Sequence, residues 1–582
     1  MKASSPVPWS RFKPPRSVPA WRSGLGLFQL AIVLLAGVAH AASMAWPFAF
    51  GAGLGLAQGQ PLGWLQLLAL GLLAGQLDGA RSWQRGAWLG GLFATAMLCA
   101  TFWWMFISMH RYGDLAAPLA ALAVLLLAAF LSLYYAVVCG LFALLAPARA
   151  APRALVFAAL WLLAELARVQ LFTGFPWGEG GYAHVDGWAR PLAAWIGVHG
   201  LSFLAAFIAA WAAFLLLAPA TRWLAVLGGV LLVLAWLPQS VTAEADPALA
   251  APLTVTLLQG NIPQDEKFQD QTGVTTALRW YGEQLLDAKT ALVVAPETAL
   301  PLLPQQLPSG YLEALQARFA TGAQAALIGL PLGSYEAGYS NSVIGLKPAA
   351  LPATKVKATA DALDAAMSAQ PAAPSPPAPP APEPYRYDKH HLVPFGEFIP
   401  TGFRWFTNLM HIPLGDFNRG AIGQPSFDWQ GQRLAPNICY EDLFGEELGA
   451  RFIDPARAPT IFVNVSNIGW FGNTVAIDQH LQISRMRALE FGRPMIRATN
   501  TGATVIIDHR GRVTQSLERH TQGVLIGAVQ GRSSITPYAW WVSRLGLWPL
   551  WALGLLVAWL ALTVRHQEAR QAGRAPPLRR VK

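Results

Sequence analysis

The chain has 582 residues, of which 54% are hydrophobic and only 13% are charged. Soluble domains usually carry about 25% charged residues, so this composition excludes an ordinary soluble enzyme. The net charge of +10 would suit a nucleic-acid-binding protein, but the basic residues lie beside long apolar segments, where anionic lipid headgroups are the expected partners. The composition therefore predicts a membrane protein and no nucleic-acid partner.

Eight apolar segments are long enough to cross a bilayer, which takes roughly 20 residues as a helix. Seven of them fall within residues 25–240, and the eighth follows much later in the chain. The segment at 116–146 is longer than one span needs, so a kink or a partly interfacial position is the alternative there. The predicted spans are 25–43, 62–79, 87–109, 116–146, 154–173, 190–218, 222–238 and 543–564.

Basic residues in short connections mark the cytoplasmic side of a membrane. They concentrate in the tails at 1–24 and 565–582 and in the connections after the second, fourth and sixth predicted spans. The loop at 44–61 has no charged residue. Both tails are therefore expected in the cytoplasm, which agrees with an even number of spans. The domain between the seventh and eighth spans must then face the outside.

Residues 251–535 have the composition of a globular domain. The domain begins with the alternating, β-branched text "LTVTLLQGNI", which is typical of a strand. Helical and strand patterns then alternate, and a hairpin with its turn at 508–512 follows. This order predicts a layered α/β domain.

An Ala/Pro-rich segment at 349–384 interrupts this domain. It has no apolar face, so it cannot bury enough surface to offset the entropy of ordering it. We predict a disordered surface insertion, with a Pro-rich docking site as the alternative.

The three cysteines differ in their predicted surroundings. Cys99 and Cys139 fall within predicted spans, whereas Cys439 is the one cysteine of the outer domain and has no disulfide partner there. An unpaired thiol in an oxidising compartment is either buried in a core or used chemically.

Three motifs place a reactive side chain at the end of an apolar strand. Glu297 lies in "VVAPETALP", Lys389 in "YRYDKHHLVPFGEFIP" and Cys439 in "NICYED". A thiolate nucleophile, a carboxylate base and an ammonium group that stabilises an oxyanion together predict acyl transfer through a thioester. Taken singly, each has a structural alternative: a strand-end cap, a surface lysine and a buried core cysteine.

No cofactor and no metal are expected. The neighbouring His390 and His391 could suggest a metal site, but adjacent histidines in an extended chain point to opposite faces, and no further ligand cluster accompanies them. A Gly-rich phosphate loop and zinc-type cysteine spacing are also missing from the sequence.

The motifs "APETALP", "YDKHHLVPFGEFIP", "NICYED" and "ALEFGRP", in this order, resemble the nitrilase superfamily and its Glu-Lys-Cys triad. Eight spans with the domain between the last two, together with "TGFPW" and "LLQGNIPQDEKF", resemble the apolipoprotein N-acyltransferase family, the membrane-embedded branch of that superfamily. The resemblance covers nearly the whole chain apart from the tails and the Pro-rich insertion.

The resemblance implies a fold, a reaction and a location. It implies a nitrilase-like αββα sandwich in the periplasm, on the outer leaflet of a bacterial inner membrane, with both termini in the cytoplasm. The expected acyl donor is a phospholipid, typically phosphatidylethanolamine. The expected acceptor is the α-amino group of the diacylglyceryl-cysteine that begins an apolipoprotein.

Motif matching also implies roles for individual residues. Cys439 matches the nucleophile, Glu297 the general base and Lys389 the oxyanion-stabilising cation. Glu397 matches an accessory acid, and Tyr440 and Glu441 match required positions beside the nucleophile. The expected substrate-binding residues are Phe268, Trp405, Phe406 and Trp470.

Two further expectations concern the lipid side of the protein. The aromatic segment 401–417 is predicted to be a lid that dips into lipid, with ordinary core packing as the alternative. Glu165 and Arg168, three residues apart in the fifth predicted span, could pair on one helical face and anchor the bundle beneath the site.

Two other functions remain open at this stage. A membrane-anchored nitrilase-type amidase would use the same triad and resolve the thioester with water, although a soluble substrate needs no platform of eight spans. A non-catalytic membrane scaffold would not need all three reactive side chains at strand ends.

Overall fold

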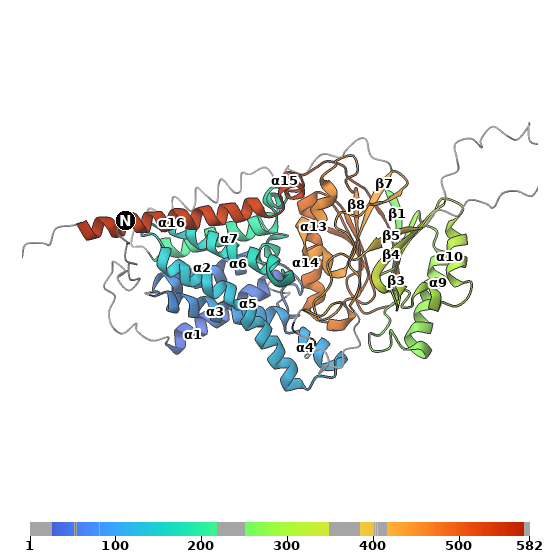
Figure 1. The fold of residues 1–582 in the computed structure, drawn as a ribbon, viewed down its shortest axis with the longest axis horizontal. Helices are drawn as coiled ribbons and strands as arrows, with labels where there is room; N and C mark the ends of the chain where they lie inside the picture. Colours follow the sequence, from blue (N-terminus) through green and yellow to red (C-terminus); the bar gives the residue numbers. More distant parts are fainter. Residues whose placement is uncertain are drawn as a thin grey trace, which may run out of the picture.

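The computed structural model describes residues 26–217 except 52, 54 and 81, then 251–348, 384–400, 402, 404 and 416–574. A helical bundle occupies one end of the molecule and a two-sheet sandwich occupies the other (Figure 1). The predicted span at 222–238 and the predicted insertion at 349–384, apart from its last residue, lie outside the described residues.

Helices lie over each of the other predicted spans. Among the described residues, five helices or helix groups are long and apolar enough to cross a membrane, or up to six if the bent pair of α3 with α4 and η4 is one span. Segment 116–146 is one uninterrupted helix, α5. The helices of the bundle are α1 (Leu27–Met44), α2 (Gly63–Asp78), α3 (Trp83–Phe102), α5 (Ala117–Leu145), α6 (Ala150–Gln170), α7 (Ala193–Leu216) and α16 (Trp548–Arg574).

The helical segment at the predicted span 87–109 is bent. Helix α3 ends at Phe102, and α4 (Met105–Ile107) with η4 (Ser108–Tyr112) continues at an angle of 60°. The buried Trp104 lies at the bend, donates a hydrogen bond to Gln479 over 3.1 Å and packs against Phe471 with ring centroids 4.2 Å apart. These contacts to the sandwich favour the bend.

As far as its residues are described, the sandwich has two six-stranded sheets, in the orders β12-β1-β2-β3-β4-β5 and β11-β10-β9-β8-β7-β6. Strands β1, β2 and β3 run parallel, as do β7, β8 and β9. The first sheet contains β1 (Leu253–Gln259), β2 (Leu292–Val294), β3 (Ala325–Ser334), β4 (Gly338–Leu346), β5 (Tyr385–Asp388) and β12 (Gly523–Val529). The second contains β6 (Phe427–Trp429), β7 (Gln432–Ile438), β8 (Ile461–Ser466), β9 (Met495–Thr499), β10 (Val505–Ile507) and β11 (Val513–Ser516).

Helices cover the outer face of each sheet, as the prediction of a layered α/β domain requires. Helices α9 (Thr275–Asp287) and α10 (Tyr311–Phe319) cover the first sheet, and α13 (Gly445–Gly449) and α14 (Val475–Phe491) lie between the second sheet and the bundle (Figure 1). Apolar side chains of β1, β2, β7 and β8 fill the space between the sheets. The predicted hairpin turn is also present, since the Asp508 N–H donates to the Arg512 carbonyl over 2.9 Å.

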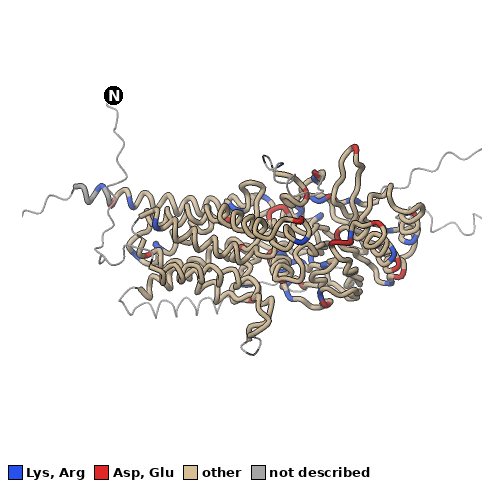
Figure 2. Tube along the Cα trace, turned by 90° about the horizontal axis from the view of Figure 1, so that it is seen from below, with Lys and Arg blue, Asp and Glu red and all other residues tan. Residues whose placement is uncertain are grey.

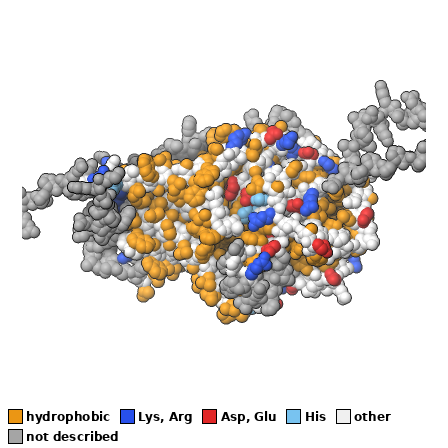
Figure 3. Space-filling view, in the orientation of Figure 1, with side chains coloured by type: hydrophobic (Ala, Val, Ile, Leu, Met, Phe, Trp, Pro, Cys, Tyr) orange, Lys and Arg blue, Asp and Glu red, His pale blue; other side chains and the backbone are white. Residues whose placement is uncertain are grey.

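Charge and apolar surface are divided between the two regions. Lys, Arg, Asp and Glu concentrate on the sandwich, while the bundle is almost free of them except near its ends (Figure 2). Hydrophobic side chains cover the visible face of the bundle (Figure 3). This distribution is the one that a lipid environment around the bundle favours.

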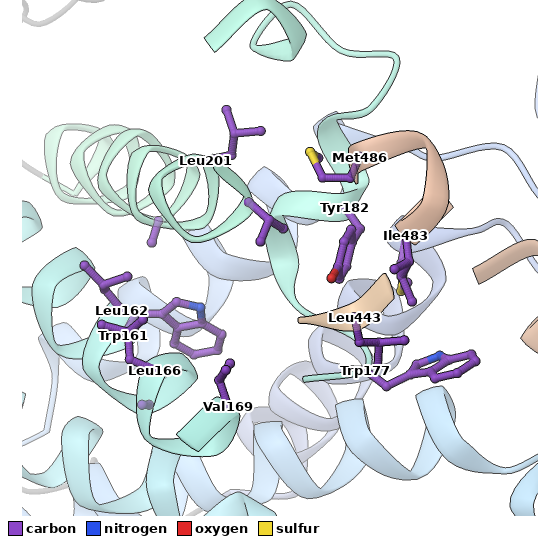
Figure 4. Close-up of a cluster of buried hydrophobic side chains, with 14 of the residues drawn as sticks. Trp161, Leu162, Leu166, Val169, Trp177, Tyr182, Leu201, Leu443, Ile483 and Met486 are labelled. Carbon is purple, nitrogen blue, oxygen red and sulfur yellow. The ribbon is translucent and has the colours of Figure 1, made fainter. Parts of the chain in front are cut away.

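One hydrophobic core joins the bundle to the sandwich. Side chains of α6 and α7 lie beside Leu443, Ile483 and Met486 of the sandwich (Figure 4). Helix α14 thus faces the second sheet on one side and the bundle on the other. Its side chains therefore touch both regions.

A carboxylate of α14 caps a broken helix of the bundle. Gly197 interrupts α7 with φ of 66°, so the next helical segment begins with unpaired N–H groups. Glu490 accepts a hydrogen bond from the Val198 N–H over 2.7 Å, and its other oxygen lies 3.0 Å from Arg487. Negative charge at a helix N-terminus is stabilising, so this contact helps to fix α14 on the bundle.

Glu165 and Arg168 are both buried in α6, but they do not form an ion pair with each other. Arg168 donates to the carbonyls of Phe175 and Trp177 over 2.8 and 2.7 Å. Glu165 accepts from the Gly180 N–H over 3.2 Å. The expected direct pairing is wrong, because each side chain satisfies backbone groups of the segment that follows α6.

Candidate active site

The three triad candidates follow three different strands. Glu297 comes three residues after β2, Lys389 directly follows β5, and Cys439 directly follows β7. The Lys389 N–H also donates to the Asn341 carbonyl on β4 over 2.8 Å. Rigid strands thus set the position of each side chain.

Glu297 is buried and fully hydrogen-bonded. Its Oε1 accepts from the Asn341 side-chain amide over 2.7 Å and lies 3.4 Å from Lys389 Nζ. Its Oε2 accepts from the Asn467 backbone N–H over 2.8 Å. The carboxylate is held in one orientation by donors from three separate segments.

Glu397 is a second carboxylate at the same ammonium group. Its Oε1 lies 2.9 Å from Lys389 Nζ and 2.8 Å from the Asn341 amide nitrogen. Its Oε2 accepts from the Val393 N–H over 2.9 Å. Burial lowers the pKa of Lys389, but Glu397 and Glu297 together outweigh that effect and raise it above its ordinary value. Lys389 is therefore a permanent cation.

Cys439 is half-buried, and its backbone adopts the left-handed conformation with φ of 51°. Burial raises the pKa of the thiol to about 12; the charge of Glu297 adds to this, while Lys389 and a hydrogen bond to Ser466 oppose it. The thiol is thus within electrostatic reach of both other triad residues. Because it rests protonated, it needs a base to become a nucleophile.

A histidine of α14, His480, holds the backbone carbonyl of Cys439 in place. His480 Nε2 lies 3.2 Å from this carbonyl oxygen and 2.9 Å from Asp442 Oδ1. Arg497 Nη2 lies 2.7 Å from His480 Nδ1. Since a guanidinium only donates hydrogen bonds, Nδ1 accepts and the proton of the neutral imidazole is on Nε2. Burial and Arg497 lower the pKa of His480, which agrees with the neutral ring.

Glu441 joins the nucleophile segment to the lysine segment. Its carboxylate accepts from the Ile438 N–H over 2.6 Å and the Tyr387 hydroxyl over 2.7 Å. It also accepts from the His390 N–H over 2.6 Å and the His391 N–H over 3.3 Å. Glu441 therefore fixes Cys439 and Lys389 relative to one another without touching either side chain.

Tyr440, unlike Glu441, contacts the helical bundle. Its hydroxyl donates to the Gly174 carbonyl over 3.3 Å, and its ring lies 6.1 Å from that of Phe175. The residue after the nucleophile is thus bound to the "TGFPW" segment. That segment is the same one that Arg168 holds.

The expected substrate-binding residues divide into two groups. Phe268 and Trp470 are 55% and 37% exposed, and Trp470 packs edge-on against Tyr112 of η4, with ring centroids 5.7 Å apart. Trp405 and Phe406, and with them most of the predicted lid at 401–417, lie outside the described residues. The structure brings neither Phe268 nor Trp470 into a described contact with the triad.

Sequence reasoning missed Asn341, Asn467, Lys267 and His480. Asn341 bridges the two carboxylates from β4, and no local pattern marks it. Lys267 is buried and donates to the backbone carbonyl of Glu297 over 3.2 Å. Its only local signal was its place in the "IPQDEKF" motif.

In the part of the chain that the structure describes, no group of three or more His, Cys, Asp or Glu residues could hold a metal ion. His390 Nδ1 lies 2.7 Å from the Gly420 carbonyl, and His391 Nδ1 lies 2.8 Å from Glu447. The two histidines thus have separate partners.

Comparison with known proteins decides the family. Residues 50–211 match the family model "Apolipoprotein N-acyltransferase N-terminal domain", and residues 254–538 match "Carbon-nitrogen hydrolase". The apolipoprotein N-acyltransferase of Verminephrobacter eiseniae is 57% identical over 544 residues, which cover 89% of this chain and 94% of that relative. The chain belongs to the apolipoprotein N-acyltransferase family.

Other relatives agree. The apolipoprotein N-acyltransferase of Ralstonia nicotianae is 43% identical over 88% of this chain and 90% of its own length. That of Bordetella bronchiseptica is 41% identical over 95% of this chain and 98% of its own. The chain is thus an acyltransferase of lipoprotein maturation, and the resemblance drawn from its motifs is confirmed. This finding decides against the amidase and the scaffold.

Proposed function

We propose that Cys439, Glu297 and Lys389 carry out the acyl transfer in two steps, with a phospholipid as donor. In the first step Glu297 takes the thiol proton while the sulfur attacks the ester carbonyl. Lys389 stabilises the oxyanion. The carbon–oxygen bond then breaks, Glu297 returns the proton to the leaving oxygen, and a lysophospholipid departs from a Cys439 thioester.

In the second step the α-amino group of the diacylglyceryl-cysteine of an apolipoprotein attacks the thioester. The carbon–nitrogen bond forms, the carbon–sulfur bond breaks, and a proton passes from the amine through Glu297 to the sulfur. The observation that carries this proposal is the buried cluster in which Lys389 Nζ lies 3.4 Å from Glu297 and 2.9 Å from Glu397 while both Glu297 and Lys389 act on the Cys439 thiol.

Glu397, Glu441 and Tyr440 support these three residues. Glu397 shares Lys389 and Asn341 with Glu297 and keeps the ammonium group in place. Glu441 fixes the nucleophile and lysine segments, and Tyr440 fixes the nucleophile segment on the bundle. Phe268, Trp470, Trp405 and Phe406 are proposed to contact lipid chains at the mouth of the site.

We also propose eight spans, with the sandwich in the periplasm of a bacterial inner membrane and both tails in the cytoplasm. The basic residues of the tails support this orientation. Phosphatidylethanolamine is the proposed donor. In right-side-out membrane vesicles, protease added outside should digest the sandwich, and protection of the whole sandwich would contradict the orientation.

Labelling of the acyl-enzyme tests the mechanism. Vesicles of phosphatidylethanolamine with a radiolabelled acyl chain should transfer label to the full-length protein, in a bond that hydroxylamine cleaves, and Cys439→Ala should abolish it. The matched control Cys99→Ala removes a thiol from α3 and should label normally. Label on the Cys439→Ala protein would refute the assignment of the nucleophile.

A further inference from the structure

Lys267 is a second buried ammonium group beside the triad, and nothing above gives it a role in the reaction. It lies in the turn that follows β1, and its side chain is 1% exposed. Its Nζ donates to the backbone carbonyl of Glu297 over 3.2 Å. An ammonium group has three donors, so one neutral carbonyl is poor compensation for a buried charge.

Lys267 also has no carboxylate at ion-pair distance among the residues that the structure describes, whereas Lys389 has two. Its charge nevertheless acts on both Glu297 and Cys439. A buried charge without a direct partner is costly, and such charges concentrate at functional sites. The cost suggests that Lys267 balances charge over the cluster as a whole.

The charges of the cluster support this interpretation. Glu297 and Glu397 bring two negative charges, and Lys389 brings one positive charge, so Lys267 makes the cluster neutral. Glu441 and Asp442, which also lie nearby, are compensated separately. Glu441 accepts hydrogen bonds from Tyr387 and three backbone N–H groups, and Asp442 lies 3.5 Å from Arg497.

We propose that Lys267 is a positioning residue that holds the backbone of Glu297 and whose charge stabilises the negative charge that passes from Glu297 to the Cys439 sulfur. The inference rests on the roles proposed above for Glu297 and Cys439. When the proton moves, the negative charge passes from Glu297 to the sulfur, and the total charge does not change. Lys267 interacts with both groups, so its charge compensates the thiolate that forms on Cys439 as Glu297 is neutralised.

The charge of Lys267 should be lost at moderately alkaline pH. Burial lowers its pKa to about 8, although the charges of Glu297 and Cys439 oppose this. Lys389 stays charged there, because its pKa is raised. The Cys439 thiol, with a pKa of about 12, stays protonated. Lys267 is thus the group of this cluster that titrates near pH 8.

The test is the single-turnover rate of acyl-Cys439 formation from phosphatidylethanolamine vesicles without acceptor, measured across pH. The wild-type rate should fall as pH rises through about 8. Lys267→Arg stays charged over this pH range, so its rate should not fall near pH 8. Lys267→Met should be about 10- to 100-fold slower at neutral pH, the effect of one nearby charge, with no inflection near 8. Lys289→Met, which removes an exposed lysine of the same domain, should behave as wild type.

The outcomes separate this inference from the mechanism. Label that persists in Cys439→Ala overturns the mechanism itself. If Cys439 is the labelled residue but Lys267→Met reacts at the wild-type rate, the role of Lys267 is overturned. Thermal unfolding shows whether Lys267→Met folds. If Lys267→Met does not fold, the pH dependence of the rate in Lys267→Arg tests the role of Lys267. A fall in rate near pH 8 in that variant overturns the inference. A wild-type rate that stays flat between about pH 7 and 9 overturns it as well.

Discussion

Replacing Glu441 by glutamine should loosen the link between the nucleophile and lysine segments. One carboxylate oxygen accepts from Ile438 and Tyr387, and the other accepts from His390 and His391. In Glu441→Gln the new NH₂ group must face one of these pairs of donors. The backbone N–H groups on that side lose their acceptor, although a Tyr387 hydroxyl facing the NH₂ can turn and accept from it, and the remaining bonds become neutral. A charge-assisted hydrogen bond contributes about 1.5 to 3 kcal/mol and a neutral one about 0.5 to 1.5 kcal/mol.

The expected loss is therefore about 3 to 6 kcal/mol of unfolding free energy, a large share of the roughly 5 to 15 kcal/mol of a typical domain. Tyr387→Phe is the matched control, because it removes one of the four hydrogen bonds and leaves the carboxylate. It should cost about 1.5 to 3 kcal/mol. Acyl-enzyme formation should fall more in Glu441→Gln than in Tyr387→Phe, because only the former frees the backbone beside Cys439 or Lys389.

The assays are thermal unfolding of the detergent-solubilised protein, followed by circular dichroism, and the acyl-enzyme labelling described above. Equal unfolding temperatures for wild type and Glu441→Gln would show that the carboxylate does not hold the two segments together. A destabilised Glu441→Gln protein that still forms acyl-enzyme at the wild-type rate would show that this link does not set the geometry of the reaction.

Two further predictions concern the support of the site. His480→Phe removes one of the two hydrogen bonds to the Cys439 carbonyl and leaves the one from Asn464. It should slow acyl-enzyme formation by about 100-fold, as small misplacements of a nucleophile do, with the apparent KM for phospholipid unchanged; a rate within twofold of wild type would contradict it. Glu490→Gln leaves Arg487 without its carboxylate at 3.0 Å and should cost about 3 kcal/mol in thermal unfolding. The double variant Glu490→Gln/Arg487→Met should lose less than the sum of the two single changes, and additive losses would argue against a coupled pair.

The bend after α3 shows where sequence patterns stop being informative. The text around Trp104 is continuously apolar and contains neither Pro nor Gly, so it predicts a helix that runs on. The helix bends where Trp104 meets Gln479 and Phe471, about 375 residues further along the chain. A contact between such distant residues leaves no trace in local periodicity.

By itself, the sequence determined the apolar helices, the alternating strands and helices of the sandwich, and the positions of Glu297, Lys389 and Cys439 at strand ends. These features depend on local composition and on the period of apolar residues, which a single chain displays directly. Motif order then predicted the acyltransferase family.

Only the tertiary structure decided what surrounds those three residues. Asn341 bridges Glu297 and Glu397, Lys267 reaches the carbonyl of Glu297, and His480 reaches that of Cys439. Each contact joins segments that only the pairing of strands and the packing of α14 bring together. The hydrogen bonds that fix a reactive group depend on distances in space, and the spacing of residues along the chain does not contain those distances.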